Sequence, residues 1–305
     1  RDLHSFPTRR SSDFSKMQKA GHGSLVETEE HEFYIAHLMS RPLTGTKLNP
    51  LGRETALQKV YWTKDGWLEL AYGSNLAKMS TQAPAGIISE EKDIISNDLF
   101  DDFESGIYNL EFMTPYHHPD SSWVNVKNGH LELCGRGSFF SQNNPSILAT
   151  RATTFEYHIQ TKLDFKPEHF SQTAGLGLYY DSNNWVYAYI GLNDQENCRK
   201  ISILQAKLGE RIPFDFDVTE IPEDAIPELR WNYKNGIAQA FYRCKEEWIP
   251  LAEPVDVRYL SDEGVNGEPG EIGGFTGLFN FIGSVDAYQH TSHAEFFYYQ
   301  VKADS

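Results

Sequence analysis

Residues 155–165 alternate between apolar and polar side chains in the stretch "FEYHIQTKLDF", with Thr161 at one of the otherwise apolar positions. Successive side chains of a β-strand point to opposite faces of a sheet, so this pattern predicts a strand with one buried face. The same behaviour recurs in "AGLGLYY", "NWVYAYIGL", "RKISILQA", "ELRWNYKNGIAQAFYR" and "AEFFYYQVKA". With roughly a dozen strands and no convincing helix, residues 98–305 are predicted to form one all-β, two-sheet sandwich of the jelly-roll type.

Turn signals and composition divide the rest of the chain. Asp65-Gly66 and Asn235-Gly236 each lie between two strand-like runs, and these residue types tolerate the positive φ of a tight hairpin. Residues 14–79 contain four short strand-like runs and are too short to be a full domain. Residues 80–97 are polar, carry Pro and Gly and show no period, which predicts a linker.

The overall charge narrows the class of ligand. The 305 residues carry a formal net charge of −16, which repels phosphate backbones and anionic lipid. No apolar run approaches the ~20 residues that span a bilayer. A neutral ligand is therefore expected, with no nucleic-acid or membrane partner. Three widely spaced cysteines without a metal-ligand pattern, namely Cys134, Cys198 and Cys244, indicate reduced core residues rather than a disulfide framework.

The first thirteen residues differ in character from everything that follows. They form a basic string without hydrophobic periodicity, and the back-translated run from His4 to Asp13 resembles a common sequencing adapter read as coding sequence. We interpret residues 1–13 as an adapter-derived artefact that is set aside before fold reasoning, with a natural basic arm as the alternative. On this interpretation the true N-terminus is missing, so a leader peptide or a preceding domain is neither inferred nor excluded.

The stretches "KAGHGSLVETEEHEFYIAHLMSRPL" and "NPLGRETALQKVYWTKDGWLEL" follow one another in the first part of the chain. They resemble the last part of the catalytic five-bladed β-propeller of glycoside hydrolase family 43, of the β-xylosidase type. "SILATRATTFEYHIQTKLDFKPEHFSQTAGLGLYYDSNNWVYAYIG", "GGFTGLFNFIG" and "AEFFYYQ" resemble the concanavalin A-like sandwich that follows it. The resemblance covers about residues 16–301 and implies a propeller end at 14–79 and a complete concanavalin A-like jelly-roll sandwich at 98–305.

The resemblance implies an exo-acting, inverting glycosidase that removes xylose or arabinofuranose from hemicellulose oligosaccharides. Its base, its acid and a third carboxylate that tunes the acid would all precede the "GHGSLVET" element, so no catalytic residue is assigned in this chain, which we predict to be inactive alone. The resemblance requires no cofactor and allows a structural calcium ion. The expected partner is a neutral xylo-oligosaccharide, and a homo-oligomer is allowed in the intact enzyme. The compartment stays open, with the cytoplasm favoured over secretion or the periplasm.

Three residues are candidates for substrate binding by this resemblance. It places His22 on the propeller axis, where the ring contacts a central ion or water, whereas the residues alone favour a hydrogen-bonded core histidine. Arg53 matches an arginine that binds sugar hydroxyls, with a structural salt bridge to Glu54 or Glu27 as the alternative. Phe275, between glycines, matches a phenylalanine that closes the sugar pocket, with core packing as the alternative.

Other polar and aromatic residues are given structural roles. Glu27 and Glu54 are expected to accept backbone donors or to pair with an arginine, because buried carboxylates are usually paired. Asp101 and Asp102 are expected to cap a turn rather than bind a metal. Core packing is likewise expected for the tryptophans that could otherwise stack on sugars, Trp123, Trp185 and Trp231. A non-catalytic carbohydrate-binding or structural sandwich remains the alternative function, since this fold hosts lectins and enzymes alike.

Overall fold

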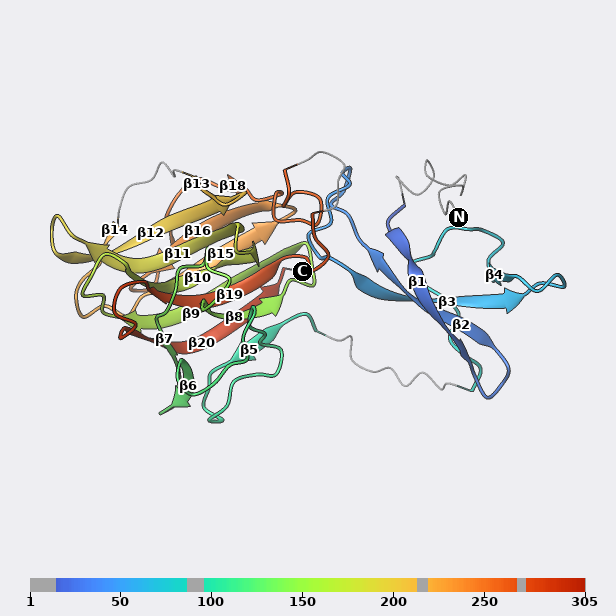
Figure 1. The fold of residues 1–305 in the computed structure, drawn as a ribbon, viewed down its shortest axis with the longest axis horizontal. Coiled ribbons are helices and arrows are strands. Elements are labelled where there is room, and N and C mark those ends of the chain that lie inside the picture. The colour runs from blue at the N-terminus through green and yellow to red at the C-terminus, as the bar shows by residue number, and fades with distance from the viewer. Residues whose placement is uncertain (1–14, 87–95, 213–218, 268–272, 305) are drawn as a thin grey trace.

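Two bodies of β-structure make up the molecule in the computed structural model: a four-stranded sheet and a larger two-sheet sandwich (Figure 1). The structure describes residues 15–86, 96–212, 219–267 and 273–304. Within these ranges the chain is all-β, as predicted, and has no helix long and apolar enough to cross a membrane. The adapter interpretation concerns residues 1–13, which lie outside the described residues.

The four-stranded sheet is antiparallel, with its strands in sequence order. They are β1 (Gln18–Glu27), β2 (Phe33–Ser40), β3 (Glu54–Trp62) and β4 (Leu68–Leu70). The predicted hairpin at Asp65-Gly66 joins β3 to β4, with Gly66 at a φ of 80°. The first residues of the predicted linker lie against this sheet, because the Tyr34 hydroxyl donates to the Gln82 carbonyl at 3.0 Å. Residues 87–95 of that segment lie outside the described residues.

One sheet of the sandwich has seven strands in the order β13-β12-β11-β10-β19-β8, with β14 also paired to β12. These strands are β8 (Ser146–Arg151), β10 (Gln172–Asp181), β11 (Asn184–Asn193), β12 (Cys198–Lys207), β13 (Glu210–Ile212), β14 (Thr219–Glu220) and β19 (Phe279–Asp286). The long strands β10, β11 and β12 are buried along most of their length, as their apolar sequences require.

The other sheet has nine strands in the order β17-β16-β15-β9-β20-β7-β6, with β18 paired to β16 and β5 to β20. These strands are β5 (Leu99–Asp101), β6 (Val124–Lys127), β7 (His130–Cys134), β9 (Glu156–Phe165), β15 (Glu228–Lys234), β16 (Ile237–Arg243), β17 (Ile249–Pro250), β18 (Val255–Asp256) and β20 (His293–Ala303). The predicted hairpin joins β15 to β16, and both Asn235 (φ 49°) and Gly236 (φ 85°) adopt the left-handed conformation.

The main hydrophobic core lies between the two large sheets. Strand β9 confirms the alternation seen in the sequence, because every second side chain from Tyr157 to Phe165 is buried and those between are partly exposed. Polar groups in this core bond across it: the Trp231 indole donates to the Leu176 carbonyl at 3.0 Å, and the Tyr157 hydroxyl donates to Asn280 at 2.8 Å. Such satisfied buried donors fix the position of one sheet on the other.

The aromatic and cysteine predictions have different outcomes. Trp123, Trp185 and Trp231 are all buried, which confirms them as packing residues. All three cysteines are free. Cys134 is half-buried and packs against the main core, Cys198 is half-buried, and the prediction of a core position was wrong for Cys244, which is exposed.

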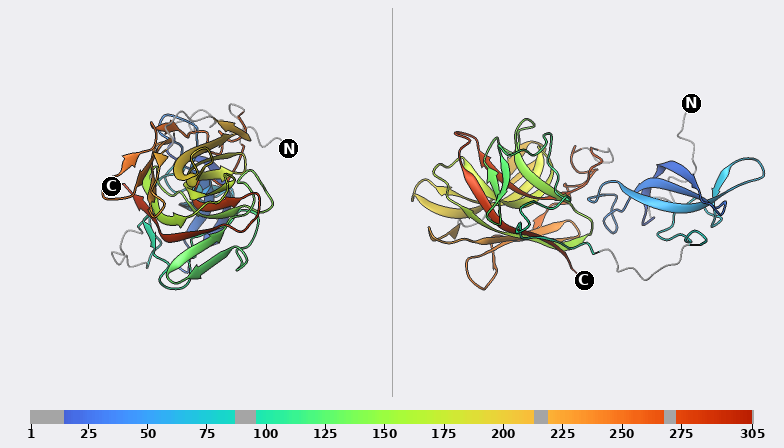
Figure 2. Two further views of the ribbon diagram at one scale, coloured as in Figure 1. Left: turned by 90° about the vertical axis from the view of Figure 1, so that its left-hand side faces the viewer. Right: turned by 90° about the horizontal axis from the view of Figure 1, so that it is seen from below.

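The segment between β2 and β3 joins the two bodies. In Figure 1 and in the right-hand view of Figure 2 it reaches from the four-stranded sheet to the loops of the sandwich that precede β19. The amide of Leu278 donates to the carbonyl of Pro50 at 2.6 Å, and the amide of Asp262 donates to that of Asn49 at 3.2 Å. The two bodies therefore meet through main-chain hydrogen bonds.

Candidate functional site at the junction of the two bodies

Two glycines face each other where the β2–β3 segment meets the sandwich. Gly52 (φ 68°) and Gly277 (φ 74°) both adopt the left-handed conformation. A Cβ atom on Gly52 would lie 2.5 Å from the Gly277 nitrogen, and one on Gly277 would lie 2.5 Å from the Gly52 nitrogen. The two chains approach this closely only because neither residue has a side chain. Gly52 directly precedes Arg53, and Gly277 lies two residues after Phe275, so both glycines are close in sequence to a predicted site residue.

Arg53 and Phe275 contact each other at this junction. The guanidinium carbon of Arg53 lies 4.9 Å from the centre of the Phe275 ring, within the range of a cation–π interaction. The Arg53 amide also donates a hydrogen bond to the Phe275 carbonyl at 3.2 Å. The structure therefore brings together two candidates that the sequence places in different parts of the chain.

Phe275 lies in the loop before β19, not in the strand. Its side chain is 64% exposed, so the alternative of core packing is wrong. Phe281, two strand positions beyond Phe279, is fully buried, so the burial of this aromatic series begins within β19 and not in the preceding loop. A large exposed aromatic ring held by an arginine is available for contact with a ligand.

The guanidinium of Arg53 is also bonded to a buried carboxylate. Its Nη1 donates to Oδ2 of Asp262 at 2.5 Å, and Oδ1 of Asp262 accepts the Tyr180 hydroxyl at 2.7 Å. Asp262 is completely buried. Burial, together with the Asp262 carboxylate, raises the pKa of the Tyr180 phenol, which keeps that group a hydrogen-bond donor. A salt bridge was one expectation for Arg53, but the partner is Asp262, and the expectation of Glu54 or Glu27 was wrong.

Two further charged residues, Lys19 and Glu263, lie beside the ion pair of Arg53 and Asp262. Lys19 of β1 bonds to Glu263, and its Nζ lies 3.7 Å from Oδ2 of Asp262. Burial, and then repulsion from Arg53, lower the pKa of Lys19 to about 8, against the opposing attraction of Asp262. Glu263 also accepts the backbone amide of Asn49 at 2.8 Å. The acidic pair of the sandwich thus holds both β1 and the β2–β3 segment.

His22 lies on β1 at a β-bulge. Pairing with β2 passes from Gly21 opposite Leu38 to Gly23 opposite His37, which leaves His22 as the extra residue with a φ of 50°. The side chain is exposed and makes no hydrogen bond to any described residue, so the expectation of a hydrogen-bonded core histidine was wrong. Bulges and left-handed non-glycine residues are enriched beside active sites, which fits the pocket role without testing it.

The remaining carboxylates serve local structure. Glu54 accepts two hydrogen bonds from Arg41, at 2.7 and 2.8 Å, which confirms its pairing with an arginine. Glu27 is exposed and bonds instead to His31 at 2.7 Å, so its expected pairing was wrong. Asp101 accepts the amides of Phe103 and Asn109, and Asp102 accepts that of Glu104, which confirms turn capping.

Metal binding finds little support in the described residues. The one group of potential ligands found there comprises Glu196, Cys198 and Glu220, on or beside β12 and β14, which carry no predicted site residue. His22 belongs to no such group, and Ca²⁺ prefers several oxygen ligands over a single imidazole. A central ion at His22 and a structural calcium ion elsewhere therefore stay predictions.

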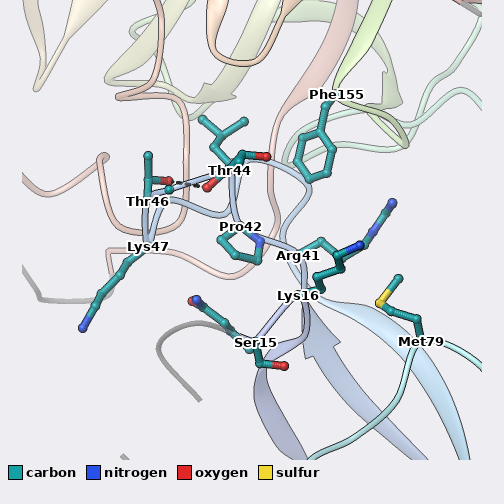
Figure 3. Close-up of a pocket in the computed structure, with 12 residues that line it drawn as sticks. Ser15, Lys16, Arg41, Pro42, Thr44, Thr46, Lys47, Met79 and Phe155 are labelled. Atoms are coloured by element: carbon teal, nitrogen blue, oxygen red, sulfur yellow. Dashed lines mark hydrogen bonds between the residues drawn. The ribbon is translucent and has the colours of Figure 1, made fainter. Parts of the chain in front are cut away.

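A cavity of about 720 Å³ lies beside the junction, where the β2–β3 segment meets Phe155 of the sandwich. Figure 3 shows Phe155 facing Arg41, while Lys47 extends away from both. The Arg41 guanidinium is held by Glu54 and by the Thr153 carbonyl, and lies 5.4 Å from the Phe155 ring. None of the three predicted binding residues lines this cavity.

Sequence reasoning missed Asp262, Tyr180 and Lys19. The acidic pair in "LSDEG" could have been noticed, but nothing in its spacing links it to Arg53. The alternation in "GLGLYY" indicates only that neighbouring tyrosines face opposite sides of a sheet. The charge network depends on long-range contacts between the two bodies.

Comparison with known proteins places this geometry in a family. Residues 100–302 match the family model described as the beta xylosidase C-terminal Concanavalin A-like domain, and residues 4–68 match the model for glycosyl hydrolases family 43. The chain belongs to glycoside hydrolase family 43. Its sandwich is the concanavalin A-like domain of β-xylosidase-type members, and its four-stranded sheet is the C-terminal part of the family's propeller.

Individual relatives agree with this placement in family 43. A beta-xylosidase of Bacillus subtilis is 31% identical over 302 residues, which is 94% of this chain and 54% of that protein. A xylosidase/arabinosidase 43B of Humicola insolens is 30% identical over 96% of this chain and 54% of that protein. The crystal structure of xylan beta-1,4-xylosidase from Bacillus halodurans has a TM-score of 0.88 at 32% identity, covering 98% of this chain and 56% of that one. The chain thus spans about half the length of these relatives.

Proposed function

We propose that this family 43 chain is the C-terminal half of an exo-acting β-xylosidase, which releases terminal xylose, or arabinofuranose, from hemicellulose oligosaccharides. The relatives named above are described as a xylosidase, a xylosidase/arabinosidase and a xylan xylosidase. The net charge of −16 suits a neutral carbohydrate. The proposed reaction requires no cofactor.

The observation that carries the proposal is the contact between Arg53 and Phe275. A guanidinium offers planar, fixed donors to neighbouring hydroxyls, and an aromatic face offers apolar contact to a sugar ring. Asp262 holds one donor of Arg53, and the ring lies against the guanidinium, so both groups are positioned before any ligand binds. Such positioning lowers the cost of ordering side chains on binding.

Hydrolysis would proceed with inversion. A carboxylic acid protonates the glycosidic oxygen while a carboxylate activates water on the opposite face of the sugar. The described carboxylates beside the junction are already used: Asp262 and Glu263 hold basic side chains, and Glu54 pairs with Arg41. We therefore assign the acid, the base and the tuning carboxylate to a part of the intact enzyme outside these residues, with His22 facing the same pocket.

The proposal is tested by assaying the intact enzyme, rebuilt from the genomic sequence upstream, beside the chain itself. We expect the intact enzyme to hydrolyse an aryl xyloside and the purified chain to show no turnover, since acid and base groups each contribute on the order of 10²–10⁴-fold. Phe275→Ala in the intact enzyme should lower kcat/KM, and Phe170→Ala, at a comparably exposed phenylalanine, should not. Turnover by the isolated chain, or equal effects of the two variants, would refute it.

A further inference from the structure

A second cavity, of about 390 Å³, opens on the sandwich beside Phe275. It is bounded by the loop at residues 113–116, by the loop that carries Phe275, and by the adjoining ends of β8, β10 and β19. Its lining is mostly apolar and strongly aromatic, with Tyr116, Tyr179, Tyr180, Phe275 and Phe279 among the residues. Cavities lined in this way, with a few placed polar groups, are the common form of small-ligand sites.

The hydroxyl of Tyr179 is the first such polar group. Tyr179 is only 5% exposed, and its hydroxyl makes no hydrogen bond to any described residue. Burial, and then the neighbouring Tyr116 phenol, raise the pKa of Tyr179, so its hydroxyl stays protonated. A buried hydroxyl without a partner is unfavourable, so this hydroxyl would gain a hydrogen bond once a ligand in the cavity displaces a neighbouring side chain and reaches it.

Tyr116 is held over the cavity by a strained turn. The amide of His117 donates to the Pro115 carbonyl at 2.8 Å, and Tyr116 between them has a φ of 67°. This three-residue turn is rare and strained, and a bulky side chain seldom adopts such a φ. The turn leaves the Tyr116 ring 53% exposed above the buried Tyr179. Strained residues of this kind cluster at active sites and ligand clamps, which makes Tyr116 a candidate ligand contact.

Asp181 supplies a fixed acceptor in the cavity wall. Its Oδ1 accepts the Asn183 amide at 2.8 Å and the Asn184 side chain at 2.9 Å, which orients the carboxylate. Within the described residues its Oδ2 makes no hydrogen bond, so this oxygen can accept a hydroxyl. A carboxylate in a cavity without a basic side chain in its lining disfavours anions and suits a neutral, hydroxyl-bearing ligand.

We propose that this cavity is a second carbohydrate site, which binds one pyranose ring of a neutral oligosaccharide between Tyr116 and Phe275. The ring's apolar face packs on the aromatic side chains, one sugar hydroxyl bonds to the Tyr179 hydroxyl, and another donates to Asp181. Phe275 belongs to this site and to the contact with Arg53. Binding here needs no acid or base, so it stands apart from hydrolysis.

Titration of the whole chain with xylotriose, followed by ligand-observed NMR, tests the site. Tyr179→Phe removes only the unpaired hydroxyl, so we expect about 3–10-fold weaker binding with a melting temperature that is unchanged or higher. Tyr157→Phe is the matched control, because its hydroxyl bonds to Asn280 in the core. That variant should lose stability and keep wild-type affinity.

Two substitutions of exposed tyrosines complete the test. Tyr116→Ala should weaken xylotriose binding by about 3–10-fold, and Tyr288→Ala, at a tyrosine of comparable exposure outside the cavity, should not. The proposal is overturned if the wild-type chain does not bind xylotriose, or if Tyr179→Phe and Tyr116→Ala bind it as tightly as wild type. These outcomes are independent of the proposed activity, which is measured by turnover of the intact enzyme.

Discussion

Arg53 lies between a buried carboxylate and an exposed ring, with its guanidinium carbon 4.9 Å from the centre of Phe275 and its Nη1 2.5 Å from Asp262. The side chain itself is 13% exposed. The ion pair anchors one edge of the guanidinium, and the ring fixes its plane. Arg53 therefore has a structural role at the junction in addition to its proposed contact with sugar.

Arg53→Ala should consequently damage both stability and activity. In this chain the substitution leaves Asp262 buried with the Tyr180 hydroxyl but without its arginine, so we expect a loss of about 3–5 kcal/mol in the free energy of unfolding. In the intact enzyme kcat/KM should also fall at least about tenfold. Urea denaturation and a xyloside assay measure the two effects.

Arg41→Ala provides the matched control for Arg53→Ala. Its ion pair with Glu54 is partly exposed, at 29% and 24% for the two side chains, so the loss in stability should be about 1 kcal/mol or less. An equal loss of stability in the two variants would show that the buried pair with Asp262 is not what anchors the junction.

Gly277→Ala should destabilise the contact between the two bodies and lower the free energy of unfolding. The new Cβ would lie 2.5 Å from the backbone of Gly52, at a residue with a φ of 74°. Gly45→Ala is the control, because Gly45 has a φ of 75° and no atom within 4 Å of such a Cβ. Backbone strain alone costs about 1–2 kcal/mol, and overpacking adds about 1–3 kcal/mol at Gly277. Equal unfolding free energies for the two variants would argue against close contact of the loops.

The strands could be predicted from the sequence because alternation and turn signals involve only residues that are close together in the chain. The alternation in β9 and the hairpin at Asn235-Gly236 depend on neighbouring residues, and both are confirmed. The family resemblance named Arg53 and Phe275, and their contact in the structure agrees with a shared site.

The partners of these residues could not be predicted in the same way. Asp262 reaches Arg53 from the other body of the molecule, and Tyr180 lies on a strand where alternation indicates a face and not a partner. The approach of Gly52 to Gly277 likewise depends on how two loops dock. The prediction of a core position was wrong at Cys244 for a related reason. Whether a small residue is buried depends on the strand edge or loop in which it lies, and Cys244 is exposed.

Strand β1 should be the least protected of the long strands. Eight of its ten residues are exposed, including the apolar Leu25 and Val26, and among the described strands it pairs only with β2. Strand β11 pairs on both sides and is buried along most of its length. Amide hydrogen exchange should therefore be much faster in β1 than in β11, and limited proteolysis should cut residues 15–86 before the sandwich. Similar protection of the two strands would contradict this order.

Lys19 should make stability depend on pH in a defined window. The pKa of Lys19 is lowered from 10.5 to about 8, chiefly by burial and next by Arg53. Between these two values the unfolded chain binds more protons than the folded chain, so the contribution of Lys19 to the free energy of unfolding rises with pH from about 8 and levels off near 10.5. Below pH 8 both states are protonated, and this contribution is constant.

The measurement is urea denaturation of the wild-type chain and of Lys19→Met between pH 7 and 10. Subtracting the variant removes the contribution of other titrating groups, including the Tyr180 phenol. The difference should be flat up to about pH 8 and should then rise in favour of the wild type. Lys64→Met, at an exposed lysine of the β3–β4 turn, serves as the control and should not reproduce this rise. A wild-type advantage that falls with pH in this window would mean that the attraction of Asp262 and Glu263 outweighs burial at Lys19.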